Sequence, residues 1–337
     1  MMGSQLGGIR AVPGELILRI VENMDTKTRE NFMIIDKDMY TLIKTYEHSI
    51  SRGRAAFFML PPQGNVLSSS ATERCIVLKN TFSMVRELER RDKRINRLIA
   101  WCPKAFCIHS PPWLPCLTVP QQARLVAVIK RALYQCDRIA DIAANEPGSL
   151  VPLERDQGTV PEMFQHPDAS TFPDDGDLFT LNPLAKPIVR PKQIEYIRSL
   201  PLEDTAGIFL TINGLGIGLM CSCTCNSPQR YERMTVIEEC VLRHGTWFVW
   251  SRLLGSAKWN DLANSIIHMG WAEMKGWESG AISGPPGLKM SLMQRFRELL
   301  GGGDMDEFVA KMTKLFEKLV LGDDKKPAGP ESGPDDK

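Results

Sequence analysis

Apolar residues recur every three or four positions near the start of this chain, over residues 12–46. Pro13 suits the first position of a helix because its missing N–H would be unpaired there, and Glu15 follows where the helix dipole favours a carboxylate. Asp25 can cap a second helix and Asp36 a third. The pattern therefore predicts a small helical module whose first helix carries an apolar stripe that must be buried against another surface. The stripe consists of Leu16, Ile17, Ile20, Val21 and Met24.

At these residues the chain resembles an F-box, whose family pattern opens with Leu-Pro-x-Glu-Leu-Leu-x-x-Ile and continues with Leu-Val-Cys-Lys-x-Trp. Two segments carry the resemblance: Val12-Pro13-Gly14-Glu15-Leu16-Ile17-Leu18-Arg19-Ile20 and Ile34-Ile35-Asp36-Lys37-Asp38-Met39-Tyr40. The remainder is similar to fungal F-box-containing proteins of unassigned role, at Arg198-Ser199-Leu200-Pro201-Leu202-Glu203-Asp204 and Leu242-Arg243-His244-Gly245.

The resemblance implies that the module docks on the Skp-type adaptor of a cullin–RING ubiquitin ligase, while the larger body recruits a protein target for ubiquitination. Such a protein positions its target, performs no bond chemistry itself and needs no cofactor. The residues expected to bind the adaptor are Pro13, Glu15, Leu16, Ile17, Ile20, Val21, Met24, Ile35, Met39 and Tyr40.

Composition limits the class of protein. A chain of 337 residues with 43% hydrophobic content can bury a substantial core, and a net charge of +1 gives no global field that would attract nucleic acid or a membrane surface. We expect no transmembrane helix and no signal peptide. Nine cysteines in such a chain are typical of reduced thiols. These features predict a protein of the cytoplasm, the nucleus or both.

Helical spacing continues through most of the chain, which predicts an all-α fold. A Pro- and Ser-rich stretch over 61–70 indicates a linker, and seven prolines interrupt the helical period over 146–190. Further helices are expected near 72–99, 121–145 and 228–244. We divide the chain into an F-box-like module at 9–50, a linker at 51–71, a helical body at 72–321 that includes the irregular segment 146–190, and a disordered tail at 322–337.

The segment 72–99 is densely charged, with six Arg and Lys residues interleaved with Glu87, Glu89 and Asp92. Pairing between residues four apart on a solvated face explains this pattern better than a nucleic-acid strip does, because the carboxylates would weaken such a strip.

Candidate chemical sites are few. Gly214-x-Gly216-x-Gly218 lacks the spacing of a nucleotide-binding loop and indicates a tight turn with close backbone approach. One candidate zinc set comprises Cys221, Cys223, Cys225, Cys240 and His244, and another cluster comprises Cys102, Cys107, His109 and Cys116. Free buried thiols are the favoured interpretation of both. No catalytic residue is predicted. The alternatives to an adaptor are a helical scaffold without a ubiquitin role, and a zinc-stabilised module or metal-dependent enzyme.

Overall fold

The computed structural model describes residues 12–69, 75–109, 111, 113–146, 189–221, 230–280 and 287–322, and it confirms the all-α prediction. Within these ranges the strands are two short ones, β1 (Val66–Leu67) and β2 (Ile76–Val77). They pair antiparallel, with Val66 opposite Val77. None of the described helices is both long and apolar enough to cross a bilayer.

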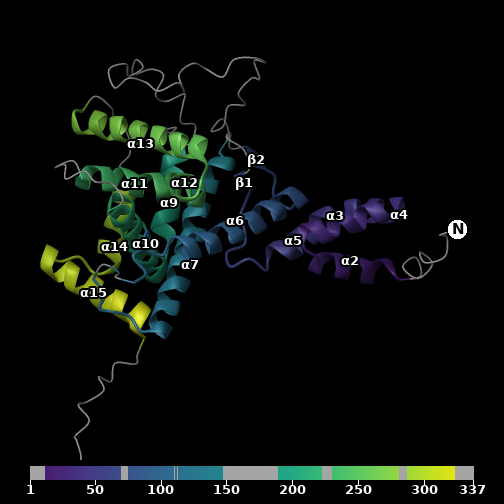
Figure 1. Ribbon diagram of the computed structural model, residues 1–337, viewed down its shortest axis with the longest axis horizontal. Coiled ribbons are helices and arrows are strands. Elements are labelled where there is room, and N and C mark those ends of the chain that lie inside the picture. The colour runs from purple at the N-terminus through teal and green to yellow at the C-terminus, as the bar shows by residue number, and fades with distance from the viewer. Residues whose placement is uncertain are drawn as a thin grey trace, which may run out of the picture.

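Four short helices form a module at the N-terminal side, and Figure 1 shows this module projecting from a larger helical body. The expected caps are present. An Asp25 carboxylate oxygen accepts a hydrogen bond from the Thr28 N–H at 2.7 Å, and Asp36 accepts one from the Asp38 N–H at 2.7 Å. The helices are α2 (Gly14–Asn23), α3 (Thr26–Ile35), α4 (Lys37–Thr45) and α5 (Glu47–Ala55).

The module has a core of its own, and this core corrects the expected linker. Residues 51–55 belong to α5 rather than to a linker, because Ile50 and Ala55 bury the helix against its neighbours. The buried residues of the module core are Ile17, Val21, Met39, Ile43, Ile50 and Phe82. The module therefore extends beyond residue 50 and includes the first residue of the next helix.

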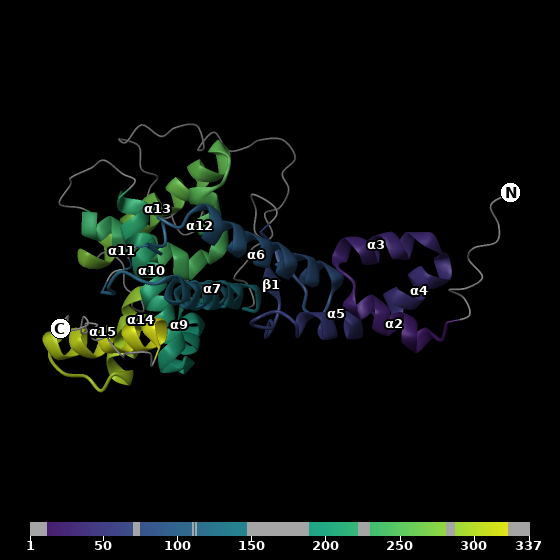
Figure 2. The same ribbon diagram turned by 60° about the horizontal axis from the view of Figure 1, so that its bottom comes forward.

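That next helix, α6 (Phe82–Trp101), has 20 residues and joins the module to the body. Thr81 caps it by accepting a hydrogen bond from the Met84 N–H at 3.2 Å. Phe82 lies in the module core, whereas Ile95 and Leu98 lie in the core of the body. Figures 1 and 2 both place α6 between the two parts.

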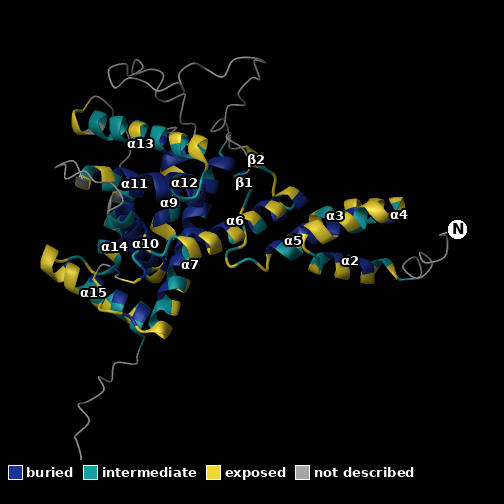
Figure 3. Ribbon diagram, in the orientation of Figure 1, coloured by how far each residue is buried: buried dark blue, intermediate teal, exposed yellow. Residues whose placement is uncertain are grey.

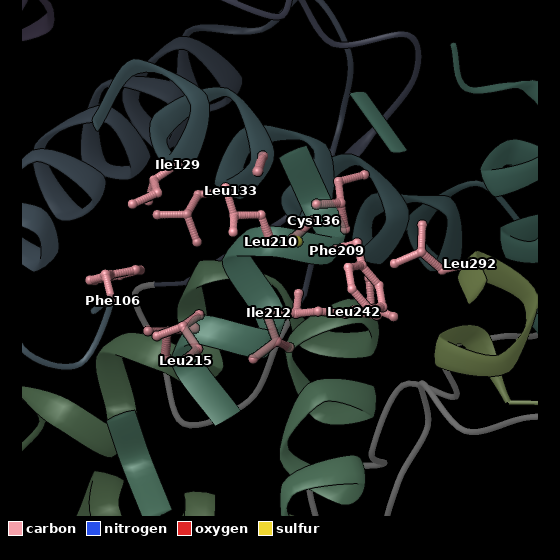
Figure 4. Packing of buried hydrophobic residues seen from close by; sticks show 14 of the residues in the cluster. Phe106, Ile129, Leu133, Cys136, Phe209, Leu210, Ile212, Leu215, Leu242 and Leu292 are labelled. Atoms are coloured by element: carbon pink, nitrogen blue, oxygen red, sulfur yellow. The ribbon is translucent and has the colours of Figure 1, made fainter. Parts of the chain in front are cut away.

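The body packs around α7 and α10, and Figure 4 shows Ile129 and Leu133 of α7 facing Leu210 and Leu215 of α10. The start of α7 is stabilised by the Gln121 side chain, which accepts a hydrogen bond from the Thr118 N–H at 2.9 Å. The body comprises α7 (Val119–Asp141), η1 (Ile142–Ala144), α9 (Val189–Ser199), α10 (Leu202–Cys221), α11 (Arg230–His244), α12 (Thr246–Leu253), α13 (Ala257–Glu278), α14 (Leu288–Leu299) and α15 (Met305–Leu321).

Two segment predictions fall largely outside the described residues. Of the segment expected to be irregular, 146–190, only residue 146 and residues 189–190 are described, and the last two already belong to α9. Of the expected disordered tail, only Gly322 is described, and it ends α15 with φ of 74°. The helix expected near 228–244 is confirmed as α11.

The glycine pattern lies inside α10, so the expected tight turn is wrong, although the expected close backbone approach is present. A Cβ on Gly218 would lie 2.3 Å from the Ala105 carbonyl oxygen, and a Cβ on Gly214 would lie 3.2 Å from that of Phe106. The glycines therefore let the segment before α7 cross α10 closely.

The charges of α6 match the prediction of a solvated face only in part, since Arg90, Lys93 and Arg97 are exposed but Glu87, Arg91 and Arg94 are buried. The Arg91 guanidinium donates to both Asp141 carboxylate oxygens, at 2.6 and 2.8 Å, and to the Leu67 carbonyl oxygen at 2.6 Å. Although burial alone would lower the pKa of Arg91, the Asp141 carboxylate raises it above its ordinary value. This cluster ties α6, α7 and β1 together.

Candidate docking surface

The apolar stripe of α2 is divided between the module core and the surface. Ile17 and Val21 are buried, whereas Leu16 is 55% and Ile20 is 53% exposed. The two exposed residues are four positions apart and therefore lie side by side on one face of the helix. The structure thus leaves a pair of large aliphatic side chains facing solvent on a helix whose other face is already packed.

The remaining residues expected to bind an adaptor divide in the same way. Met39 is buried in the module core and Met24 is half-buried against it, so neither presents a full side chain to a partner. The residues that face solvent are Pro13, Glu15, Ile35 and Tyr40.

Ile34, which was not among the expected site residues, is 82% exposed at the end of α3. Its place in the family-like segment before Asp36 is the signal that could have found it. With Ile35 and Tyr40 it adds apolar surface at the junction of α3 and α4.

The module is fixed to α6 by charged and aromatic contacts. A Glu47 carboxylate oxygen accepts the Phe82 N–H at 2.8 Å, and the Arg29 guanidinium lies 4.0 Å from the centre of the Phe82 ring. Although burial alone would raise the pKa of Glu47, hydrogen bonds from Lys44 and from the Phe82 N–H lower it. A carboxylate at the start of α6 is also favoured by the helix dipole.

The cysteine clusters show no arrangement for a metal in the described part of the chain. No group of three or more His, Cys, Asp or Glu side chains is gathered there as a metal site would require. Cys240 and His244 are buried on α11, while Cys223 and Cys225 lie outside the described residues, as does the side chain of Cys221.

The second cysteine cluster likewise forms no metal site among the described residues. Cys116 is exposed, Cys102 is half-buried, and the half-buried Cys107 thiol donates to the Gly214 carbonyl oxygen at 3.5 Å. Burial raises the pKa of the Cys102 thiol, which disfavours the thiolate that a metal would need.

Comparison of the chain with protein-family models, with curated proteins and with solved structures gave no match.

Proposed function

We propose that the N-terminal module is an F-box-like docking unit that binds the Skp-type adaptor of a cullin–RING ubiquitin ligase, and that the helical body recruits a protein target. The observation that carries this proposal is the division of the α2 stripe. A helix that only filled the core would bury Leu16 and Ile20, whereas a docking helix keeps such residues for its partner.

The contacting surface would consist of Leu16 and Ile20 on α2, with Ile34, Ile35 and Tyr40 at the junction of α3 and α4. All five side chains are exposed. The buried stripe residues would act indirectly, by holding α2 in place. In this role the protein performs no bond chemistry, requires no cofactor and works in the cytoplasm or nucleus, where the ligase would meet its targets.

The proposal is tested by pull-down of the Skp-type adaptor and cullin with the tagged full chain and with Leu16→Asp/Ile20→Asp. Both positions are exposed, so the variant should fold, while the loss of two apolar side chains from an interface costs roughly 3 kcal/mol or more. That loss corresponds to more than about a hundredfold in affinity. We expect recovery of the adaptor with the wild type alone.

A matched control keeps this test specific. Ile76→Asp/Leu78→Asp makes the same chemical change at two exposed apolar residues outside the module and should leave adaptor recovery unchanged. Far-UV circular dichroism verifies that each variant is folded. A folded wild type that recovers no adaptor, or equal loss in both variants, would leave a helical scaffold without a ubiquitin role.

A further inference from the structure

A row of basic side chains runs along the solvent side of α6. Arg90, Lys93 and Arg97 are exposed and follow one another at spacings of three and four residues, so they share one helix face. Trp101, 64% exposed, ends the row one turn beyond Arg97. We call these four residues the α6 stripe. It spans about 16 Å at the helical rise of about 1.5 Å per residue.

The acidic residues of α6, which in sequence alternate with the basic ones, are directed elsewhere. Glu87 is buried beside Arg91, with its Oε1 3.2 Å from the Arg91 Nε. Glu89 accepts the N–H of the first α3 residue at 3.3 Å, and Asp92 accepts the Tyr134 hydroxyl at 2.5 Å. Folding therefore separates the two signs of charge, and the stripe keeps only cations.

The stripe also lacks ion-pair partners among the residues that the structure describes. Arg86, one turn earlier, pairs with Glu30. Within the described ranges, no carboxylate forms such a pair with Arg90, Lys93 or Arg97. The charge of Lys93 does act on Asp25, whose pKa is lowered mainly by the hydrogen bond from the Thr28 N–H and, to a smaller extent, by Lys93.

Trp101 adds an apolar anchor to these cations. The Arg97 guanidinium lies 5.6 Å from the centre of its ring, so charge and apolar surface are presented together. Exposed Trp and Arg side chains are the residue types that carry most binding energy at protein interfaces. Figure 3 shows exposed positions recurring along α6, between the module and the body.

An acidic protein segment fits this surface better than nucleic acid does. The stripe is short and the chain has a net charge of +1, whereas phosphate-backbone binding relies on an extended basic surface. Carboxylates spaced three and four residues apart on a partner helix would match the spacing of Arg90, Lys93 and Arg97. Each of these three cations can form an ion pair with one aspartate or glutamate side chain of such a helix.

We propose that the α6 stripe binds an acidic segment of a partner protein, with Arg90, Lys93 and Arg97 pairing its carboxylates and Trp101 covering its apolar side. The assignment of this segment to a ubiquitination target rests on the proposed function above. Because α6 also carries the module, the segment would be held at a fixed distance from the adaptor-docking surface.

The test measures fluorescence anisotropy of a labelled helical peptide of about twenty residues, with glutamates at three- and four-residue spacing and one leucine per turn. The full chain is compared with Arg90→Glu/Lys93→Glu/Arg97→Glu. We expect the charge reversal to weaken binding about tenfold or more, since three pairs become repulsive. Trp101→Ala should weaken it less, and raising NaCl from about 50 to about 500 mM should weaken wild-type binding strongly.

The matched control is Lys258→Glu/Lys314→Glu/Lys318→Glu, which changes the net charge equally at exposed positions away from α6. It should bind the peptide as the wild type does. Equal loss in the control, no binding by the wild type, or equal binding of the same peptide with glutamine in place of glutamate would overturn the proposal. Tighter binding of a labelled single-stranded oligonucleotide than of the peptide, lost in the α6 variant, would also overturn it.

The two proposals fail separately in this design. The α6 variant should still recover the Skp-type adaptor, and the Leu16→Asp/Ile20→Asp variant should still bind the acidic peptide. If the wild type recovers no adaptor but still binds the peptide, the ubiquitin role is refuted and the acidic-segment surface stands. If the wild type recovers the adaptor but does not bind the peptide, only the proposal for the α6 stripe is refuted.

Discussion

Removal of the Asp141 carboxylate should destabilise the body strongly. In Asp141→Ala, the buried Arg91 guanidinium loses two charge-assisted hydrogen bonds, at 2.6 and 2.8 Å, and the Leu67 N–H loses its acceptor at 2.8 Å. Removal of one partner from a buried pair costs about 3–5 kcal/mol. Glu87, 3.2 Å from Arg91, still compensates part of the charge, so we expect about 3–4 kcal/mol.

The assay is urea unfolding followed by circular dichroism, supported by thermal melting. At about 2–4 °C per kcal/mol for a body of this size, the melting temperature should fall by about 10 °C. Asp261→Ala, an exposed aspartate on α13, should change stability by less than about 0.5 kcal/mol. The double variant Arg91→Met/Asp141→Leu should recover part of the loss, because the buried Arg91 charge is removed together with its partner while Glu87 keeps Arg94, 3.9 Å away. A cost below about 1 kcal/mol for Asp141→Ala, or a double variant no more stable than the single one, would refute the reasoning.

Three further outcomes are expected. Gly218→Ala should lower stability by about 1–2 kcal/mol in urea unfolding despite the better helix propensity of alanine, since its Cβ would lie 2.3 Å from the Ala105 carbonyl oxygen; a stabilised variant would contradict this. Phe82→Ala should cost the module about 3 kcal/mol and speed proteolysis between module and body, whereas an unchanged digestion pattern would mean that Phe82 does not join them. The pKa of Glu47 is lowered below its ordinary 4.5, so the stability that Glu47 contributes to the module is complete above that pH and is lost as the pH falls through the folded-state pKa. Glu47→Gln should therefore reduce the dependence on acid pH of the module's protection from hydrogen exchange.

Local signals predicted the module well because they act within a few residues. Asp25 and Asp36 cap helices that begin at the next residue, and the spacing of apolar residues is intrinsic to each helix. The pattern could not reveal which residues of the α2 stripe are buried in the module core and which face solvent. Leu16 and Ile17 are adjacent and both aliphatic, yet only the packing of α4 and α5 against α2 decides which of them is buried.

Long-range partners explain the features that were missed. The start of α14 has no capping side chain at Gly287, and its first N–H groups are accepted instead by Glu239 of α11, at 3.0 Å from Leu288 and 2.8 Å from Lys289. Likewise, Arg91 is buried because Asp141 meets it from 50 positions away. Neither pairing leaves a periodic trace in the sequence.

The helix α6 links two cores in a way that constrains how this protein can change over evolution. Phe82 is anchored in the module and Leu98 in the body, with about 24 Å of continuous helix between them. A single residue inserted midway would turn the body by about 100° relative to the module, whereas an insertion of seven residues would nearly restore the angle and lengthen the separation by about 10 Å. Lineages of this protein should therefore keep the length of α6 constant or alter it in steps close to whole pairs of turns.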